Sequence, residues 1–158
     1  MVNNLILPII NGIADALHKI NPDAKIFTDT PAGVQPNAAG YFYINGPVSI
    51  TETRFLKDRH QLRLTFDVMY FPPDMAAADA GLMSGMALAM TEGLYQITPA
   101  VVKDGTYTAE ALGRRGFDRD TTIVDGVVHV TTSFDLWLTT TEKKELVKSI
   151  TITFEKNE

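Results

Sequence analysis

The chain has 158 residues, of which 45% are hydrophobic and 21% charged, and this composition predicts one ordinary globular domain over residues 1–158. It contains no cysteine, which excludes thiolate nucleophiles, disulfide frameworks and zinc sites built on Cys. The net charge of −5 gives the whole protein no attraction to nucleic-acid phosphates or anionic membranes, so neither is an expected partner.

An amphipathic helix is predicted over residues 5–20, because apolar residues recur every three or four positions from Ile6 to Ile20. Asn21-Pro22 ends it. The start of this helix does not read as a signal peptide, since it lacks basic residues, and no apolar run approaches the ~20 residues that span a bilayer. We therefore expect a protein that is made and folds in a cytoplasm. Residues 24–28 are compatible with a short strand, and residues 29–40 are predicted to be a loop.

Strands are predicted next, over residues 41–44 and 48–51, on either side of a break at Asn45-Gly46-Pro47. Residues 52–61 are rich in charge and are interpreted as a loop. Residues 62–70 alternate between apolar and polar side chains, which predicts a half-buried strand that the following prolines end.

A second helix is predicted over residues 79–97, where apolar side chains recur at helical spacing before Thr98-Pro99. Residues 103–120 contain three Gly and show little periodicity, so they are interpreted as a long loop, a feature that is usually functional. A β-hairpin is predicted over residues 121–138, with Asp125-Gly126 as its turn.

The C-terminal part is predicted from weaker patterns. Residues 142–148 are compatible with a short helix or a wide turn, and residues 150–154 alternate as a last strand. Together the segments predict an α+β fold, with a mostly antiparallel β-sheet and two main helices packed on one of its faces.

The sequence contains no recognisable catalytic motif. His18, His60 and His129 are far apart and give no metal-ligand spacing, and no nucleophile elbow or glycine-rich phosphate loop is present. Asp67 and Asp135 both lie on the polar faces of predicted strands, so a small enzyme with a paired-carboxylate site stays open as an alternative. Solubility is the commoner role of such residues. We expect no catalytic residue, cofactor or metal.

Candidate interface residues stand out instead. Three Arg of the predicted loop 103–120 lie beside two Asp, a nearly balanced charge that suits a protein surface better than nucleic acid. Trp137 lies on the polar face of its strand, where it is either an interface anchor or covered by a helix, and Phe55 lies within a charged segment. The candidate interface residues are Arg54, Phe55, Arg59, Arg114, Arg115, Arg119 and Trp137.

Two stretches of the sequence resemble the phage tail terminator family. The run from Leu64 to Pro72, LTFDVMYFP, is similar to the family's F-D-I-x-Y-F-P stretch. The run from Ile123 to Val130, IVDGVVHV, follows Arg115-Gly116 and is similar to the family's E-I-V-D-G-V-L-H-F hairpin. The first helix also matches in place and length, so the similarity spans about residues 5–138 in consistent order.

The resemblance implies a non-enzymatic structural virion protein of a tailed phage or prophage, located at the head–tail junction. It implies a subunit that forms a hexameric ring on the head-proximal end of the tail tube, ends tube polymerisation and joins the tail to the head. The implied partners are further copies of the chain, the tail tube protein and a head-completion or neck protein. A ring needs heterologous contacts, which the charged segments 52–61 and 103–120 are expected to provide. Another neck or tail-completion protein of the same plan is the alternative.

Overall fold

The computed structural model describes residues 3–29, 39–56, 59–73, 79–98, 101–103, 106–108, 114–115, 117–139 and 151–152. Within these, the surroundings of side chains are described for residues 6–29, 39–53, 61–73, 79–98 and 119–135. The elements, in chain order, are α1 (Asn3–Ile20), β1 (Lys25–Phe27), β2 (Tyr41–Leu56), β3 (Arg59–Phe71), α2 (Ala80–Gly93), β4 (Gln96–Ile97), β5 (Val101–Lys103), β6 (Thr106–Thr108), β7 (Arg114–Arg115), β8 (Phe117–Val124), β9 (Val127–Thr139) and β10 (Thr151–Ile152).

The strands form one six-stranded sheet and two small ribbons. In the large sheet the order is β1-β2-β3-β9-β10, and β8 also pairs with β9. All pairs in this sheet are antiparallel except β1 with β2, which is parallel. The ribbons pair β4 with β7 and β5 with β6. The predicted α+β fold with a mostly antiparallel sheet is confirmed.

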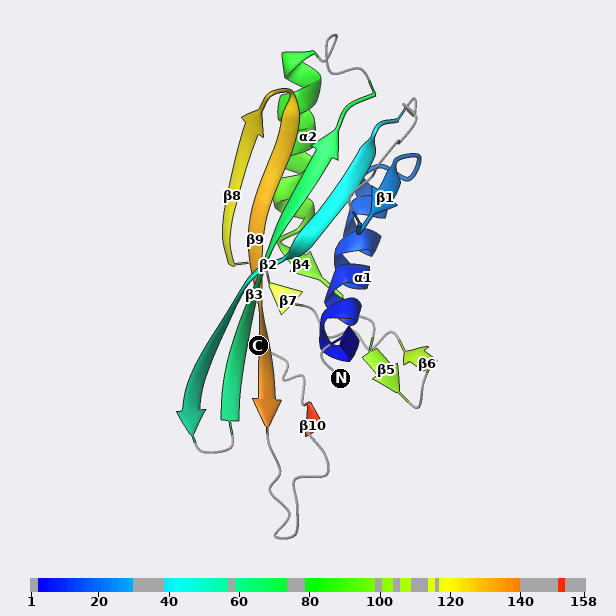
Figure 1. The fold of residues 1–158 in the computed structure, drawn as a ribbon. Helices are drawn as coiled ribbons and strands as arrows, with labels where there is room; N and C mark the ends of the chain where they lie inside the picture. The colour runs from blue at the N-terminus through cyan, green and yellow to red at the C-terminus, as the bar shows by residue number, and fades with distance from the viewer. Residues whose placement is uncertain are drawn as a thin grey trace.

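The long strands β2, β3 and β9 run through both halves of the sheet. The sheet is strongly twisted, so that the left-to-right order of these strands in the upper half of Figure 1 is reversed in the lower half. Helix α2 and the C-terminal part of α1 lie against one face of the upper half, which we call the covered half, and the N-terminal turns of α1 extend below the level at which the long strands cross (Figure 1). We call the lower half the arm; it consists of residues 48–56 of β2, 59–65 of β3 and 133–139 of β9.

The buried core lies between the two helices and the covered half, and it reaches into the start of the arm, where Leu64 and Phe134 are buried. Ile9, Ile13 and Leu17 of α1 recur every four residues and are completely buried, as the apolar pattern predicts. Side chains of α1 and α2 belong to this one core, so both helices pack on the same face of the sheet, as the sequence predicted. The other core side chains include Met83, Ala87 and Met90 of α2 and Phe42, Ile44, Phe66, Val68, Val128, Val130 and Phe134 of the sheet.

A β-bulge separates the two halves of β2. Three residues, from Gly46 to Val48, face the single residue Phe66 of β3. Gly46 adopts a φ of +145°, and a Cβ at this position would lie 2.9 Å from Cδ1 of Phe66, so only glycine fits. The predicted break at Asn45-Gly46-Pro47 is wrong, because the bulge absorbs these residues without ending the strand.

The predicted charged loop over residues 52–61 is also wrong. β2 continues to Leu56 and β3 begins at Arg59, and only residues 57–58 between them lie outside the described part. Residues 51–53 are all exposed, so both faces of the strand carry polar side chains there. A strand without a buried face lacks the alternation by which a sequence reveals a strand.

Helix α2 is shorter than predicted. Its N-cap Asp79 accepts a hydrogen bond from the N–H of Gly81 at 3.0 Å, and the helix ends at Gly93 rather than at residue 97. A Cβ on Gly93 would lie 2.7 Å from Cδ1 of Ile20, so glycine lets the chain pass close to α1. Ile97 is buried, as expected of an apolar residue, but it lies in β4.

The predicted long loop over residues 103–120 is wrong in part. It contains β6, β7 and the first residues of β8, and residues 104–105, 109–113 and 116 lie outside the described part. Two-residue and three-residue strands in small ribbons are too short to produce an apolar period.

The predicted hairpin over residues 121–138 is confirmed. Its turn residues Asp125 and Gly126 have φ values of 52° and 76°, as a two-residue hairpin turn requires. Part of the predicted last strand is β10, which pairs with Leu138 and Thr139, whereas residues 142–148 lie outside the described part.

Candidate interaction surfaces

Strand β2 forms an open edge of the sheet along the arm. β1 pairs with β2 only at residues 41–43, and within the described residues no strand pairs with the outer side of residues 48–53. All six of these side chains are exposed, with Val48 at 51% and Ile50 at 54%. The neighbouring Leu64 of β3 is only 2% exposed. The arm therefore presents apolar side chains on a strand edge to which another strand can add.

A polar network on the other face of the arm joins β3 to β9. Arg63 donates to both carboxylate oxygens of Asp135, from Nε at 2.9 Å and from Nη2 at 3.2 Å, and Gln61 Nε2 donates to Oδ2 at 2.9 Å. At the next pair on this face of the two strands, the hydroxyls of Thr65 and Ser133 lie 2.8 Å apart. Asp135 is 7% exposed, so its carboxylate oxygens take their hydrogen bonds from these donors rather than from water. The network stabilises the arm where no described helix covers it.

Four of the seven predicted interface residues come together at the far end of the arm. Arg54 and Phe55 lie at the end of β2, and Arg59 lies at the start of β3 beside them. Trp137 pairs with Gln61 of β3 in the adjoining part of the sheet. The backbone thus groups these four residues, while their side chains lie outside the described part.

The adjacent arginines Arg114 and Arg115 of the predicted interface lie elsewhere in the fold. Arg114 and Arg115 form β7 and pair with Ile97 and Gln96 of β4. This small ribbon lies near the level at which the long strands cross in Figure 1, and it contacts β9. The strand pairing therefore does not bring this pair to the end of the arm that holds Arg54.

Arg119 has an internal structural role in the subunit. Its Nη1 donates to the backbone carbonyl of Thr91 at 2.5 Å, and its guanidinium lies 4.7 Å from the centre of the Tyr95 ring. The Thr91 hydroxyl donates a hydrogen bond to the backbone carbonyl of Ala87 at 2.7 Å. The same hydroxyl lies 2.6 Å from the hydroxyl of Thr121. These contacts attach the end of α2 to β8. Arg119 lies in a strand, and not in the loop that sequence analysis predicted.

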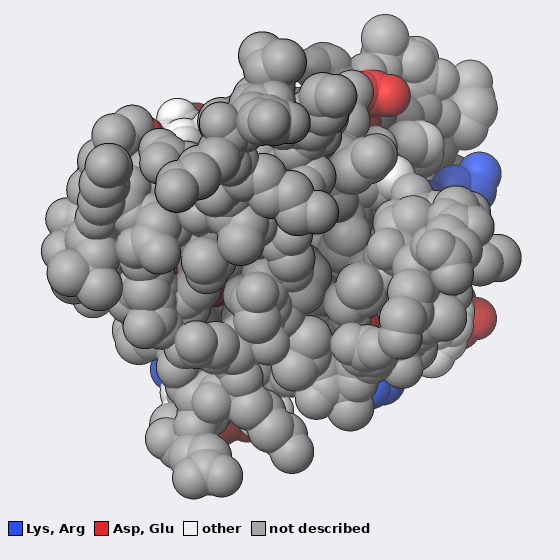
Figure 2. Space-filling view, turned by 90° about the horizontal axis from the view of Figure 1, so that it is seen from below, with Lys and Arg blue, Asp and Glu red and all other residues white. Residues whose placement is uncertain are grey.

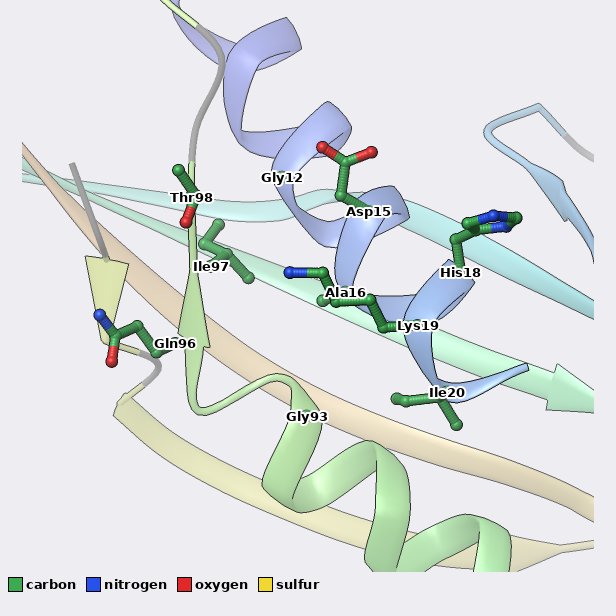
Figure 3. A pocket seen from close by; sticks show the side chains of 10 residues that line it. All are labelled: Gly12, Asp15, Ala16, His18, Lys19, Ile20, Gly93, Gln96, Ile97 and Thr98. Atoms are coloured by element: carbon green, nitrogen blue, oxygen red, sulfur yellow. The ribbon is translucent and has the colours of Figure 1, made fainter. Parts of the chain in front are cut away.

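A shallow groove of about 360 Å³ lies between α1 and the chain segment that follows α2. Its polar lining comes from Asp15, His18, Lys19, Gln96 and Thr98, all of which are exposed. In Figure 3 the Lys19 side chain extends toward β4, whereas Asp15 and His18 point away from it. The sequence alone does not reveal this groove, because its two walls are far apart in the chain. Exposed groups that do not converge give it no catalytic arrangement.

The paired-carboxylate alternative is wrong in its geometry. Asp67 pairs with Thr131, and Asp135 pairs with Arg63. The two carboxylates are therefore four residues apart along neighbouring strands, or roughly 13 Å. Asp135 is bound by Arg63, and Oδ2 of Asp67 lies 3.4 Å from Nδ1 of His129. They occupy separate environments and do not form one acid–base pair. Among the described residues, no three His, Asp or Glu side chains group as metal ligands.

A few described charged side chains are visible from below the molecule. In this view Lys, Arg, Asp and Glu side chains of the described part appear at separate places around the rim (Figure 2). Within the part of the chain that the structure describes, neither helix is long and apolar enough to cross a membrane.

A comparison with protein families agrees with the resemblance noted in the sequence. The family model described as phage tail terminator protein matches residues 8–146, a range that begins within α1 and ends beyond β9. No curated protein matches the sequence. The match covers most of the chain, including α2 and most of α1. The chain therefore belongs to the phage tail terminator family and is a structural protein of phage tails.

Proposed function

We propose that this protein forms a hexameric ring on the head-proximal end of the tail tube, where it ends tube polymerisation and joins the tail to the head. The observation that carries the proposal is the family match over residues 8–146. The fold supports it, because a non-enzymatic assembly subunit needs exposed contact surfaces rather than an enclosed site. The arm supplies such a surface, with six consecutive exposed residues of β2.

The candidate interface residues divide into two groups under this proposal. Arg54, Phe55, Arg59 and Trp137 lie on the arm and would contact a neighbouring subunit or the tail tube protein. The second group would make contacts nearer the middle of the subunit and consists of Arg114, Arg115 and Arg119. Arg119 also bonds the carbonyl of Thr91 and so attaches α2 to β8. The partners are further copies of the chain, the tail tube protein and a head-completion or neck protein, all at the head–tail junction of the virion.

The direct test is electron microscopy of the purified protein, alone and mixed with tail tubes. We expect rings, or a cap at one end of each tube whose length then stays fixed. A strict monomer at high concentration that also ignores tail tubes would overturn the proposal. A different neck or tail-completion protein of a phage or prophage is the second candidate, and it predicts binding to neck proteins without any effect on tube length.

Charge reversal tests the arginine pair of β7. The variant Arg114→Glu/Arg115→Glu should keep the fold, measured by circular dichroism, yet block the attachment of heads to tails and lower the phage yield. The matched control is Lys19→Glu/Lys25→Glu, which makes the same charge change at two exposed residues, one in α1 and one in β1. An unchanged yield in the arginine variant would remove these two residues from the interface.

A further inference from the structure

The large sheet has two open edges that resemble each other in sequence and exposure. One is residues 48–51 of β2, Val-Ser-Ile-Thr, and the other is residues 121–124 of β8, Thr-Thr-Ile-Val. Neither segment contains a charged residue, and each is rich in the β-branched residues that favour strands. Within the described residues, neither has a strand on its outer side.

The aliphatic side chains of both segments are largely exposed to solvent in the single chain. Val48 and Ile50 are 51% and 54% exposed, and Ile123 and Val124 are 46% and 52% exposed. Soluble proteins usually protect an open edge with Lys, Pro or an inward-pointing charge, since a bare edge templates pairing with another chain. The bulge and Pro47 protect only the start of the first edge, and no such device lies within residues 49–51 or 121–124. These two segments therefore indicate edges that are covered in the assembled state.

The uncharged, β-branched chemistry that the two edges share favours a second copy as the occupant. Each copy carries a net charge of −5, so two copies repel each other wherever their carboxylates face. Contact between residues 48–51 and residues 121–124 sets an uncharged surface against an uncharged surface and avoids this cost. The two edges are on different strands, so their contact is heterologous and repeats from copy to copy, as a ring requires.

We propose that residues 48–51 of β2 in one copy pair as a strand with residues 121–124 of β8 in the next copy. This inference rests on the proposed ring and deepens it, because it names the two surfaces that join neighbouring subunits. The contact places Ile50 or Val48 beside Ile123, which buries aliphatic side chains that are exposed in the single chain.

The absence of cysteine allows a clean cross-linking test. We expect the variant Ser49→Cys/Thr122→Cys to form a covalent ladder of copies under mild oxidation, in the presence of tail tubes if assembly needs them. Each single variant should stay monomeric on a denaturing gel. The matched control Ser84→Cys/Thr122→Cys uses an exposed serine of α2 and should give no ladder.

Three results would overturn the inference. Dimers from either single variant would show that like edges pair with like. Cross-links only to the tail tube protein would show that the edges receive that partner instead. Absence of a ladder while wild-type rings are visible by electron microscopy would refute the edge contact and leave the proposed function standing, whereas absence of both rings and tube caps would refute the proposed function as well.

Charge variants test the same contact without cross-linking. Ile50→Lys and Ile123→Lys should each weaken assembly by more than about tenfold, because an edge lysine opposes strand pairing. Their melting temperatures should stay near the wild-type value, since both side chains are largely exposed in the single chain. The double variant Ile50→Lys/Ile123→Glu sets opposite charges across the contact and should recover most of the lost assembly. Assembly that stays as weak as in the single variants would contradict the pairing.

Discussion

A single strand, β2, connects two regions of the molecule that differ in what surrounds them. In the covered half, Phe42 and Ile44 of β2 are 0% and 1% exposed, whereas Val48 and Ile50 in the arm are 51% and 54% exposed. The residue types are similar and the strand is continuous. Burial in this sheet is therefore decided by where the helices lie, and not by the hydrophobicity of the strand.

The two regions also differ in what stabilises them. The covered half is held by apolar side chains that are removed from water between the sheet and two helices. The described part of the arm carries charge-assisted hydrogen bonds from Arg63 and Gln61 to Asp135. The comparison predicts that substitutions in the covered half cost the most stability and that substitutions on the open edge of the arm cost the least.

The largest effect is expected for Phe66→Ala in the covered half. The ring is completely buried and its centre lies 6.2 Å from that of Phe134, so its loss leaves a cavity. The free energy of unfolding, measured by urea denaturation, should fall by about 3–5 kcal/mol. The control Phe66→Leu keeps much of the volume and should lose clearly less. Equal losses in the two variants would mean that packing at this position does not set the stability.

A smaller loss is expected for Arg63→Met on the arm. The substitution leaves the buried Asp135 carboxylate with Gln61 as its only described side-chain donor, which should lower the unfolding free energy by about 1–3 kcal/mol. The double variant Arg63→Met/Asp135→Leu removes the stranded charge and should recover part of the loss. If the single variant is as stable as the wild type, the network does not stabilise the arm.

A pH-dependent effect of about 0.5–1.5 kcal/mol is expected for Tyr70→Phe, which removes one buried hydrogen bond. Tyr70 donates to the carbonyl of Ala39 at 3.0 Å, and burial raises the pKa of Tyr70 above its ordinary value of 10.0. A raised pKa in the folded state gives stability that is complete below the unfolded pKa and is lost as the pH rises through the folded one. Above pH 10, wild-type stability should therefore fall more steeply than that of the variant in urea denaturation. Parallel curves would contradict this.

The smallest effect is expected for Ile50→Thr on the open edge. The side chain is 54% exposed, so the unfolding free energy of the single chain should change by less than about 0.5 kcal/mol. A calorimetric loss comparable to that of Arg63→Met would show that the edge is already covered within one subunit, which would remove the difference between the two regions.

Local patterns predicted the covered half well. The apolar stripe of α1 and the Asp125-Gly126 turn are signals contained in a few neighbouring residues, and both appear in the structure as expected. The bulge at Gly46 and the strand over residues 52–56 were not predicted. A Gly-Pro pair and a charged run look the same in a loop and in a bulged strand at an open edge, and only the pairing with β3 distinguishes them.

The candidate surfaces were predicted less well than the fold, for a related reason. Arg119 was expected in a loop, but its contacts with Thr91 and Tyr95 depend on residues more than 20 positions away in the chain. The open edges at residues 48–51 and 121–124 were identified as strands in the sequence, yet only the sheet order shows that each has a free side.

The close approach of Gly46 and Phe66 links the interior of the protein to the direction of the arm. The same ring fills the core beside Phe134 and fixes the bulge from which the arm leaves the covered half. A side chain at residue 46 would displace either the ring or the strand, and either shift would change how the arm leaves the covered half. Residues buried far from any contact surface can thus decide where that surface points, so a well-folded variant can still fail to fit its neighbours.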